Sequence, residues 1–280
     1  MLTDKLYDCL SPMVVLCACL WLAGAEYPLA VLSGGVFRLG HWLPRGELCP
    51  RGGAGLRAAL LVASPPARAA PRRRARLTWA HYARRSDIAV AFVLGSAAAP
   101  RRGSRLAREA ALHGDLVVGN FTDSRRNASL RALSMLEWAL DRCPLAPFIM
   151  KVEDHVFVNV PNVLRFVEHH KYEVRTAWGS LAREAGGEYL RGDAYILTAD
   201  LAGALLRRVW REAYSPHEAR FVWRLLAGAA AAAAHEPGLA APPPPPRARS
   251  PCPGCRSRAR SRSGNNSTTD TRRLAPQRHT

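Results

Sequence analysis

Residues 148–159 read FIMKVEDHVFVN, an apolar strand that runs into Glu153, Asp154 and His155 and then returns to apolar residues. Polar groups in this position lie at the carboxyl end of a buried strand, which is where open α/β sheets bind ligands. Acidic groups there can hold a divalent cation such as Mn²⁺, which prefers oxygen ligands and can neutralise a diphosphate. The pattern is equally compatible with an ordinary acidic loop, so it leaves both interpretations open.

Apolar runs before this stretch predict more buried strands. Residues 56–63 stop at a Ser-Pro-Pro turn and residues 88–94 stop at Gly95, and neither run alternates with polar residues. Such runs are typical of parallel strands covered on both faces. Residues 116–118 and 148–152 supply two further strands.

Helical stretches separate these strands. We expect helices over residues 72–84, 105–113 and 129–141, the last with leucines recurring at helical spacing along one face. Strands that alternate with helices predict an α/β fold, with a mostly parallel, Rossmann-like sheet flanked by helices and joined by right-handed crossovers.

The basic charge lies at the edges of the chain. The formal net charge is +18, but residues 68–85 hold seven arginines and no acid, and residues 236–280 hold nine arginines against two acids. The rest carries about +4, which is ordinary for a folded domain, so a nucleic-acid-binding protein is a weaker interpretation than a folded domain with basic ends. With 280 residues and 48% hydrophobic content, one domain with appendages is expected. We expect no nucleic-acid partner.

The N-terminus carries a membrane-targeting signal. Residues 13–25 read MVVLCACLWLAGA and follow a short polar start. We expect residues 1–28 to form an uncleaved membrane anchor, followed by a stem over residues 29–57. The small residues Ala23-Gly24-Ala25 also fit a cleavage site, so a signal peptide stays open as the alternative.

Both interpretations place the rest of the chain in an oxidising lumen. Glycosylation sequons at Asn120, Asn127, Asn265 and Asn266 agree with that placement. Four cysteines outside the apolar run are available for disulfides, although spacing alone does not pair them. They are Cys49, Cys143, Cys252 and Cys255.

The chain changes character at its C-terminal end. Residues 228–280 hold an alanine run, five consecutive prolines and an Arg/Ser tract. This composition predicts a low-complexity, disordered tail. The Cys252-Pro-Gly-Cys255 pair lies in this tail, and a local disulfide is a better interpretation than a zinc or redox site because no second pair has metal spacing.

The stretch at residues 148–159 resembles the metal-binding motif of the β-1,3-galactosyltransferase and β-1,3-N-acetylglucosaminyltransferase family. In that motif a Lys, any residue and three acids precede Val-Phe-Val-Asn, and here Lys151, Glu153, Asp154 and residues 156–159 match it. Further blocks follow in the family's order over residues 58–227. They are RLTW at 76–79, FVLG at 92–95, HGDL at 113–116, FTDS at 121–124, Cys143-Pro144 and YILT at 195–198.

The resemblance implies a GT-A type fold and an inverting hexosyltransferase. Such an enzyme transfers galactose or N-acetylglucosamine from UDP-galactose or UDP-N-acetylglucosamine, with Mn²⁺ holding the diphosphate. The acceptor would be a glycan on a glycoprotein or glycolipid, extended in β-1,3 linkage. The resemblance also implies a single-pass type II protein of the Golgi membrane, held by its N-terminal anchor with the domain in the lumen.

The matched motif positions give the expected site. Glu153 and His155 are the expected metal ligands, while Glu153, Asp154 and Arg76 are expected to bind the nucleotide-sugar. Two positions depart from the family, because His155 replaces the last acid of the metal motif and Ala219 occupies the position of the catalytic base. Glu218 is the expected replacement base.

A third departure is a shortened acceptor region between residues 162 and 189, in which the family's Lys-Trp-Tyr block is reduced to a remnant at residues 171–172.

The altered base position bears on activity, because a missing base typically removes about 10²- to 10⁴-fold of rate. A non-catalytic relative is therefore the alternative; it would keep the fold and bind nucleotide-sugar or a partner glycosyltransferase.

Overall fold

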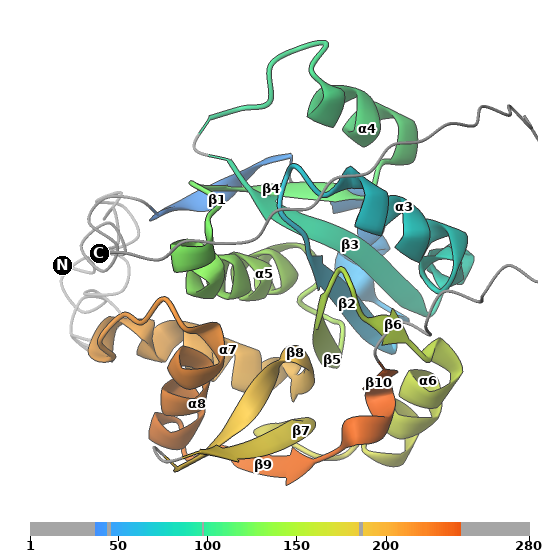
Figure 1. Ribbon diagram of the computed structural model, residues 1–280. Coiled ribbons are helices and arrows are strands. Elements are labelled where there is room, and N and C mark those ends of the chain that lie inside the picture. The colour runs from blue at the N-terminus through green and yellow to red at the C-terminus, as the bar shows by residue number, and fades with distance from the viewer. Residues whose placement is uncertain (1–36, 44–45, 97, 185–186, 242–280) are drawn as a thin grey trace, which may run out of the picture. The chain divides into compact units, whose positions relative to one another are not determined.

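The computed structural model describes residues 37–43, 46–96, 98–184 and 187–241 (Figure 1). Its strands are β1 (Phe37–Leu43), β2 (Ala58–Ala63), β3 (Ile88–Gly95), β4 (Leu116–Phe121), β5 (Phe148–Glu153), β6 (Phe157–Val158), β7 (Thr176–Glu184), β8 (Gly187–Thr198), β9 (Ala232–His235) and β10 (Ala240–Ala241). Its α-helices are α3 (Ala69–Leu77), α4 (Arg105–His113), α5 (Ala128–Arg142), α6 (Val160–His169), α7 (Ala199–Arg208) and α8 (Glu218–Gly228).

Most strands of the described residues form one mixed, eight-stranded sheet. Its order is β1-β4-β3-β2-β5-β8-β7-β9. The central strands β4, β3, β2 and β5 are parallel to one another, as the apolar runs predict. The pairs β1/β4, β5/β8 and β7/β8 are antiparallel, so the parallel part is the centre of the sheet. The prediction of an α/β sheet is confirmed, with more antiparallel pairing than expected.

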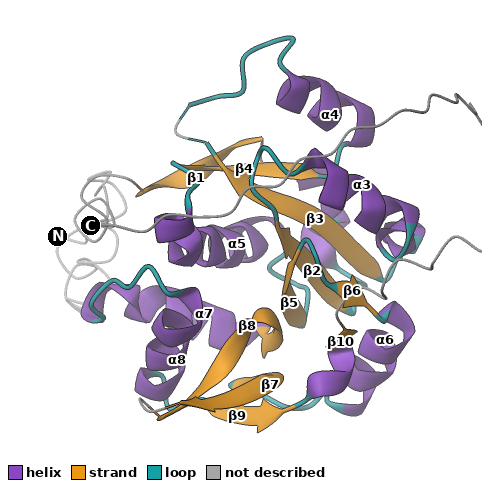
Figure 2. Cartoon of the chain, in the orientation of Figure 1, coloured by secondary structure: helices purple, strands orange, loops and turns teal. Residues whose placement is uncertain are grey.

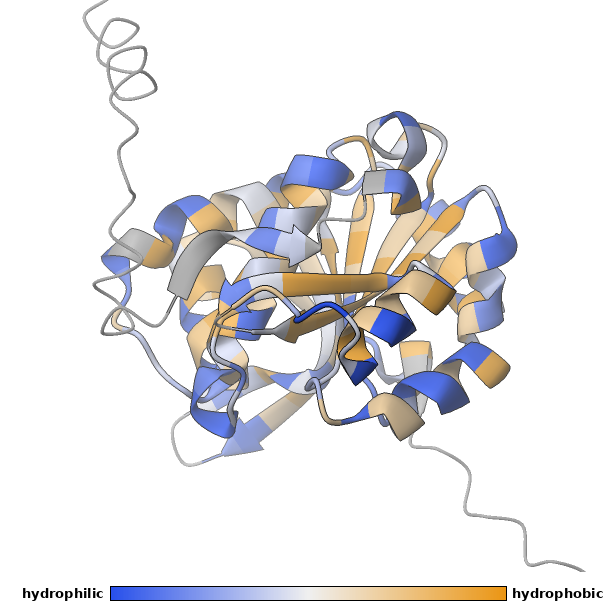
Figure 3. Ribbon diagram, turned by 90° about the horizontal axis from the view of Figure 1, so that it is seen from above, coloured by the Kyte–Doolittle hydropathy of each residue, from blue (hydrophilic) through white to orange (hydrophobic). Residues whose placement is uncertain are grey.

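Helices cover both faces of this sheet (Figure 2). Side chains of a strand alternate between faces, and in β2 the alternation divides the core in two. Leu61 packs on the face covered by α5, α7 and α8, whereas Leu60 and Val62 pack on the face covered by α3 and α6. Figure 3 shows apolar strands between helices that carry hydrophilic residues. Every residue of β2 and β3 is buried, which explains why neither run alternates with polar residues.

Helices α4 and α5 lie where the sequence predicts them, but the helix expected over residues 72–84 is broken. Helix α3 ends at Leu77, Thr78 has non-helical dihedral angles, and a short 3₁₀ helix follows at Ala80–Arg84. The Thr78 hydroxyl donates to the carbonyl oxygen of Arg74 over 2.8 Å. The side chain of Trp79 is buried, so the break turns it into the core.

The sheet extends beyond residues 58–227, so the domain limits predicted from the sequence are too narrow. Strand β1 lies inside the predicted stem and pairs with β4. Strand β9 lies inside the predicted low-complexity tail and pairs with β7 in parallel register. The tail prediction rested on composition, and β9 does consist largely of alanine. Its strand structure depends on pairing with β7 rather than on the strand propensity of its own residues.

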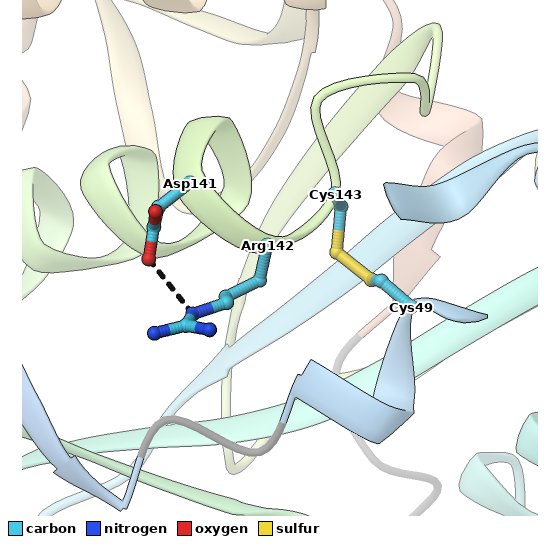
Figure 4. Close-up of a disulfide and its surroundings, with 4 residues drawn as sticks. All are labelled: Cys49, Asp141, Arg142 and Cys143. Carbon is cyan, nitrogen blue, oxygen red and sulfur yellow. Dashed lines mark ion pairs between the residues drawn. A yellow bond between two sulfur atoms is a disulfide. The ribbon is translucent and has the colours of Figure 1, made fainter. Parts of the chain in front are cut away.

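A disulfide joins Cys49 to Cys143, across 94 residues of sequence (Figure 4). Cys143 follows the end of α5, beside an ion pair between Asp141 and Arg142. Near the disulfide, the backbone N–H of Leu145 donates to the carbonyl oxygen of Gly52. The bond therefore ties the segment before β2 to the connection that leads from α5 into β5.

Several sequence predictions fall outside the described residues. They concern the membrane segment, Cys252 with Cys255, and the sequons at Asn265 and Asn266. Within the described residues, no helix combines the length and the apolar character that a membrane span requires.

Glu137 of α5 gives the domain a pH-dependent stability. Its Oε1 accepts a hydrogen bond from the Gly40 N–H at 2.6 Å, whereas Oε2 is buried without a hydrogen-bond partner in the described residues. Burial, with a smaller contribution from Asp141, raises the pKa of Glu137 to about 7. This pKa exceeds the unfolded value, so the stability it contributes is present at acidic pH and is lost as the pH rises through about 7.

We expect the free energy of unfolding to fall by about 2 to 3 kcal/mol between about pH 5 and about pH 8 because of this carboxyl group. Urea denaturation of the full chain at both pH values measures the fall. Glu137→Gln should abolish it, while Glu47→Gln, at an exposed position, should preserve it. An unchanged pH slope in Glu137→Gln would contradict the assignment.

Candidate functional site

A pocket of about 760 Å³ opens at the carboxyl ends of the central parallel strands. We call it the strand-end pocket. Its wall is formed by the loops that follow β2, β3, β4 and β5 and by the first turn of α5. Open α/β sheets bind ligands at this edge. Its ionisable wall residues are Arg68, Asp123, Arg125, Arg131, Glu153, Asp154 and His155.

Asp154 is held by an arginine that the sequence analysis did not single out. Arg68 donates from Nε to Oδ2 at 2.9 Å and from Nη2 to Oδ1 at 2.8 Å. The Ser64 hydroxyl donates to Oδ2 at 2.8 Å, and the Asp154 side chain is only 1% exposed. Both carboxylate oxygens are thus occupied by protein donors in a two-pronged arrangement that arginine makes well.

Glu153 pairs with Lys151, which is itself almost fully buried. The Lys151 Nζ lies 2.7 Å from Glu153 Oε1 and 2.9 Å from Glu218 Oε1. It also donates to the carbonyl oxygen of Gly192. One ammonium group therefore connects Glu153, in the pocket wall, with Glu218, the first residue of α8.

Two carboxylates keep this ammonium charged. Burial lowers the pKa of Lys151, but the charges of Glu218 and Glu153 outweigh burial and the net shift is upward. Tyr195 lies over the same ammonium, and its hydroxyl is 3.3 Å from Glu218 Oε1. The cluster is a buried, hydrogen-bonded charge network, which is costly to disrupt.

Asp123 is the third carboxylate in the pocket wall. Its Oδ1 accepts from Arg131 Nη2 at 2.5 Å and its Oδ2 from the Gly95 N–H at 3.0 Å. The Nε of Arg131 is buried without a hydrogen-bond partner in the described residues. Every carboxylate of the strand-end pocket is therefore paired with a basic side chain of the protein.

The predicted metal ligands lie together, beside a carboxylate that a basic side chain already covers. Glu153 and His155 both line the strand-end pocket, and His155 is exposed. Between them, Asp154 is covered by the Arg68 guanidinium, which takes the place of a cation at that carboxylate. Within the described residues, no group of three His, Cys, Asp or Glu side chains is arranged to hold a metal ion.

Arg76, predicted to bind the nucleotide-sugar, does not line the strand-end pocket. It forms ion pairs with Glu109 at 2.9 Å and with Asp115 at 2.7 Å. Glu109 also binds the fully buried Arg72, whose Nη1 donates to the Ser64 hydroxyl at 3.1 Å. Because Ser64 in turn donates to Asp154, Arg76 supports the site from behind the pocket wall. That it contacts the ligand stays a prediction.

A second pocket, of about 310 Å³, lies between the β7–β8 hairpin and α8. Tyr189, His217 and Trp223 contribute to its wall. The Tyr189 hydroxyl donates to Glu184 Oε1 at 2.6 Å. We call this second pocket the hairpin pocket. Glu218 directly follows His217 in α8, but its buried side chain pairs with Lys151 and lines neither pocket.

Comparisons with known proteins agree with the motif order. Residues 70–186 match the family model described as Galactosyltransferase. Human beta-1,3-galactosyltransferase 4 is 34% identical over 163 residues, which is 54% of this chain and 43% of that protein. Mouse acetylgalactosaminyl-O-glycosyl-glycoprotein beta-1,3-N-acetylglucosaminyltransferase is 32% identical over 170 residues, which is 53% of this chain and 43% of that protein.

The chain thus spans less than half the length of these curated relatives. Among solved structures, a mannosyltransferase from Pyrobaculum calidifontis in complex with GDP-Man and Mn²⁺ is similar with a TM-score of 0.41. It is 12% identical, and the match covers 79% of this chain and 66% of that chain. The Galactosyltransferase model and these curated relatives support the resemblance to the β-1,3-galactosyltransferase and β-1,3-N-acetylglucosaminyltransferase family.

Proposed function

We propose that this domain binds UDP-galactose or UDP-N-acetylglucosamine in the strand-end pocket and transfers the sugar to an acceptor glycan in β-1,3 linkage. The observation that carries the proposal is the pocket itself. It is large enough for a nucleotide-sugar, lies at the ligand-binding edge of the sheet, and holds three arginines that can face a diphosphate. The match to the Galactosyltransferase model and to curated relatives supports the hexosyltransferase chemistry.

The transfer is a single displacement. A base removes the proton of an acceptor hydroxyl, the oxygen attacks the anomeric carbon, and the bond to UDP breaks. Glu218 is the proposed base. Burial raises the pKa of its carboxyl group, with the Lys151 ammonium opposing that rise, and a raised pKa makes a carboxylate a stronger base. It follows His217 of the hairpin pocket, and through Lys151 it is connected to Glu153 of the strand-end pocket.

The hairpin pocket is the proposed acceptor site. Its wall combines Tyr189 and Trp223 with charged side chains, and aromatic faces with nearby hydrogen-bonding groups suit a sugar ring. The acceptor glycan would belong to a glycoprotein or glycolipid.

The Mn²⁺ predicted from the motif has no matching donor set in this arrangement of side chains. Asp154 is engaged by Arg68 and Ser64, and Glu153 by Lys151. The proposed displacement therefore includes no metal step. Arg68 takes the role in donor binding that the sequence predicts for Arg76.

We propose a Golgi membrane location, with the domain in the lumen. The Cys49–Cys143 disulfide supports an oxidising compartment. The type II anchor remains a proposal from residues 1–28, which lie outside the described residues.

Turnover of the two donors by the full chain tests the function. We expect UDP release from one donor in the presence of an acceptor glycan, and at least about tenfold less release from Glu153→Ala, which removes a wall residue of the strand-end pocket. Glu47→Ala, at an exposed position outside both pockets, serves as the matched control. UDP release that persists in Glu153→Ala would mean that the reaction does not take place in the strand-end pocket.

A non-catalytic role is the second candidate, and the Glu218 contacts favour it. Both carboxylate oxygens lie within 3.0 Å of the Lys151 ammonium, and the residue at the family's base position is Ala219. In this case the full chain would bind UDP without turnover, and Ala219→Asp would gain turnover by restoring a carboxylate. Turnover by the unmodified chain, lost in Glu218→Gln, excludes this candidate.

A further inference from the structure

The ion pairs in the strand-end pocket suggest a different way of holding a diphosphate. Each carboxylate in the wall already has a basic partner within the protein. These pairs are Asp154 with Arg68, Asp123 with Arg131, and Glu153 with Lys151. A divalent cation could bind Asp123 or Asp154 only by displacing one of their protein donors. Elsewhere in the wall it would meet Glu153, paired with Lys151 through Oε1, and the exposed His155.

The Arg68–Asp154 pair makes that displacement unfavourable. Asp154 is buried, and its oxygens receive the two arginine nitrogens and the Ser64 hydroxyl. Removing one partner of a buried charge pair is strongly destabilising. The family's additional acid, which would attract a cation, is His155 here, so the pocket wall carries three arginines against three carboxylates.

The same wall offers cationic groups to an anion. The Arg68 side chain is 45% exposed, and a guanidinium has five N–H donors, so it can bind Asp154 and a phosphate oxygen together. Arg125 is exposed at the pocket wall, and no ion pair or hydrogen bond of its side chain is found in the described part of the chain. Arg131 has a buried Nε without a hydrogen-bond partner there.

We propose that the strand-end pocket binds the diphosphate of a nucleoside diphosphate directly through Arg68 and Arg125, without a divalent cation. The inference rests on the proposed function and deepens it, because it replaces the metal of the family motif with arginines. Guanidinium groups match phosphate oxygens in a two-pronged geometry and stay charged at all relevant pH values.

Calorimetric titration of UDP into the full chain tests this proposal, once with EDTA and once with Mn²⁺. We expect UDP affinities that agree within about threefold, a difference well below the tenfold that corresponds to 1.4 kcal/mol. UMP, which has a single phosphate, should bind more weakly than UDP in both conditions. Equal binding of UMP and UDP would contradict recognition of a diphosphate.

Arginine variants locate the binding groups. Arg125→Ala should weaken UDP binding in EDTA by about tenfold or more, which is the usual scale for a hydrogen bond to a charged group. Because Arg125 is exposed and unpaired among the described residues, this change should leave folding intact. Arg68→Ala should weaken binding as well, although it also frees buried Asp154. Arg73→Ala, exposed on α3 and outside the pocket, is the matched control and should bind UDP normally.

Restoring the family's acid gives the opposite test. His155→Asp adds a carboxylate to the wall, so UDP binding should weaken in EDTA and recover with Mn²⁺. If the unmodified chain binds UDP only with Mn²⁺, the direct-binding proposal is overturned while the proposed function stands. If it binds UDP in neither condition, both are overturned.

Discussion

Replacing Lys151 by methionine is expected to lower the free energy of unfolding by about 3 to 5 kcal/mol, the usual cost of breaking a buried ion pair. Lys151 is buried between Glu153 and Glu218. Without its ammonium, Glu153 can turn to solvent because its side chain is 23% exposed, but Glu218 at 9% cannot. The loss of stability therefore arises mainly from the Glu218 carboxylate, which is left buried without a charge partner.

Denaturant unfolding of the full chain measures this loss, and two variants sharpen it. Lys171→Met removes an exposed lysine that pairs with Glu168, and a surface pair of this kind is worth about 0 to 1 kcal/mol. Adding Glu218→Gln to Lys151→Met should recover part of the stability, because no buried charge is then left unpaired. A loss below about 1 kcal/mol in Lys151→Met would show that the network does not hold α8 against β5.

Removal of the Cys49–Cys143 disulfide is the second large effect. The bond closes a loop of about 94 residues that contains β2 to α5, so it restricts the unfolded chain over much of the domain. Cys49→Ala with Cys143→Ala should lower the free energy of unfolding by about 2 to 5 kcal/mol. Replacing both cysteines avoids a single reactive thiol.

Reduction of the unmodified chain supplies the control for these substitutions, because it opens the bond without changing the sequence. Denaturant midpoints of the reduced chain and of the double variant should agree, and both should lie below that of the oxidised chain. A double variant as stable as the oxidised chain would mean that the disulfide does not contribute to the free energy of unfolding.

The central sheet could be predicted because its strands are buried on both faces. Runs such as Ala58–Ala63 and Ile88–Gly95 are apolar throughout and end at turn residues, so hydrophobicity alone identifies them. The edge strands carry no such signal. Strand β1 mixes polar and apolar residues around Gly40, and β9 consists mainly of alanine, so the order of both depends on pairing partners distant in sequence.

The site could be predicted in position but not in its contacts. Glu153, Asp154 and His155 line the pocket because they follow a buried strand. Arg68 was missed, although it lies only five residues after the end of β2, at the same edge of the sheet. Arg76 lies outside the pocket lining, and a motif match says nothing about which side of α3 faces the pocket. Pairing between β2 and β5 brings Arg68 and Asp154 together, and that pairing is not visible in either segment alone.

The alanine strand β9 has a consequence for solubility. It ends the sheet beside β7, and its four residues offer little backbone for a strand from another molecule to join. Without residues 229–241, the nine-residue strand β7 would become the edge, and β6 would lose its pairing with β10. Long unpaired edges promote aggregation between molecules. We therefore expect removal of this short alanine segment to increase self-association, an effect that its composition alone does not suggest.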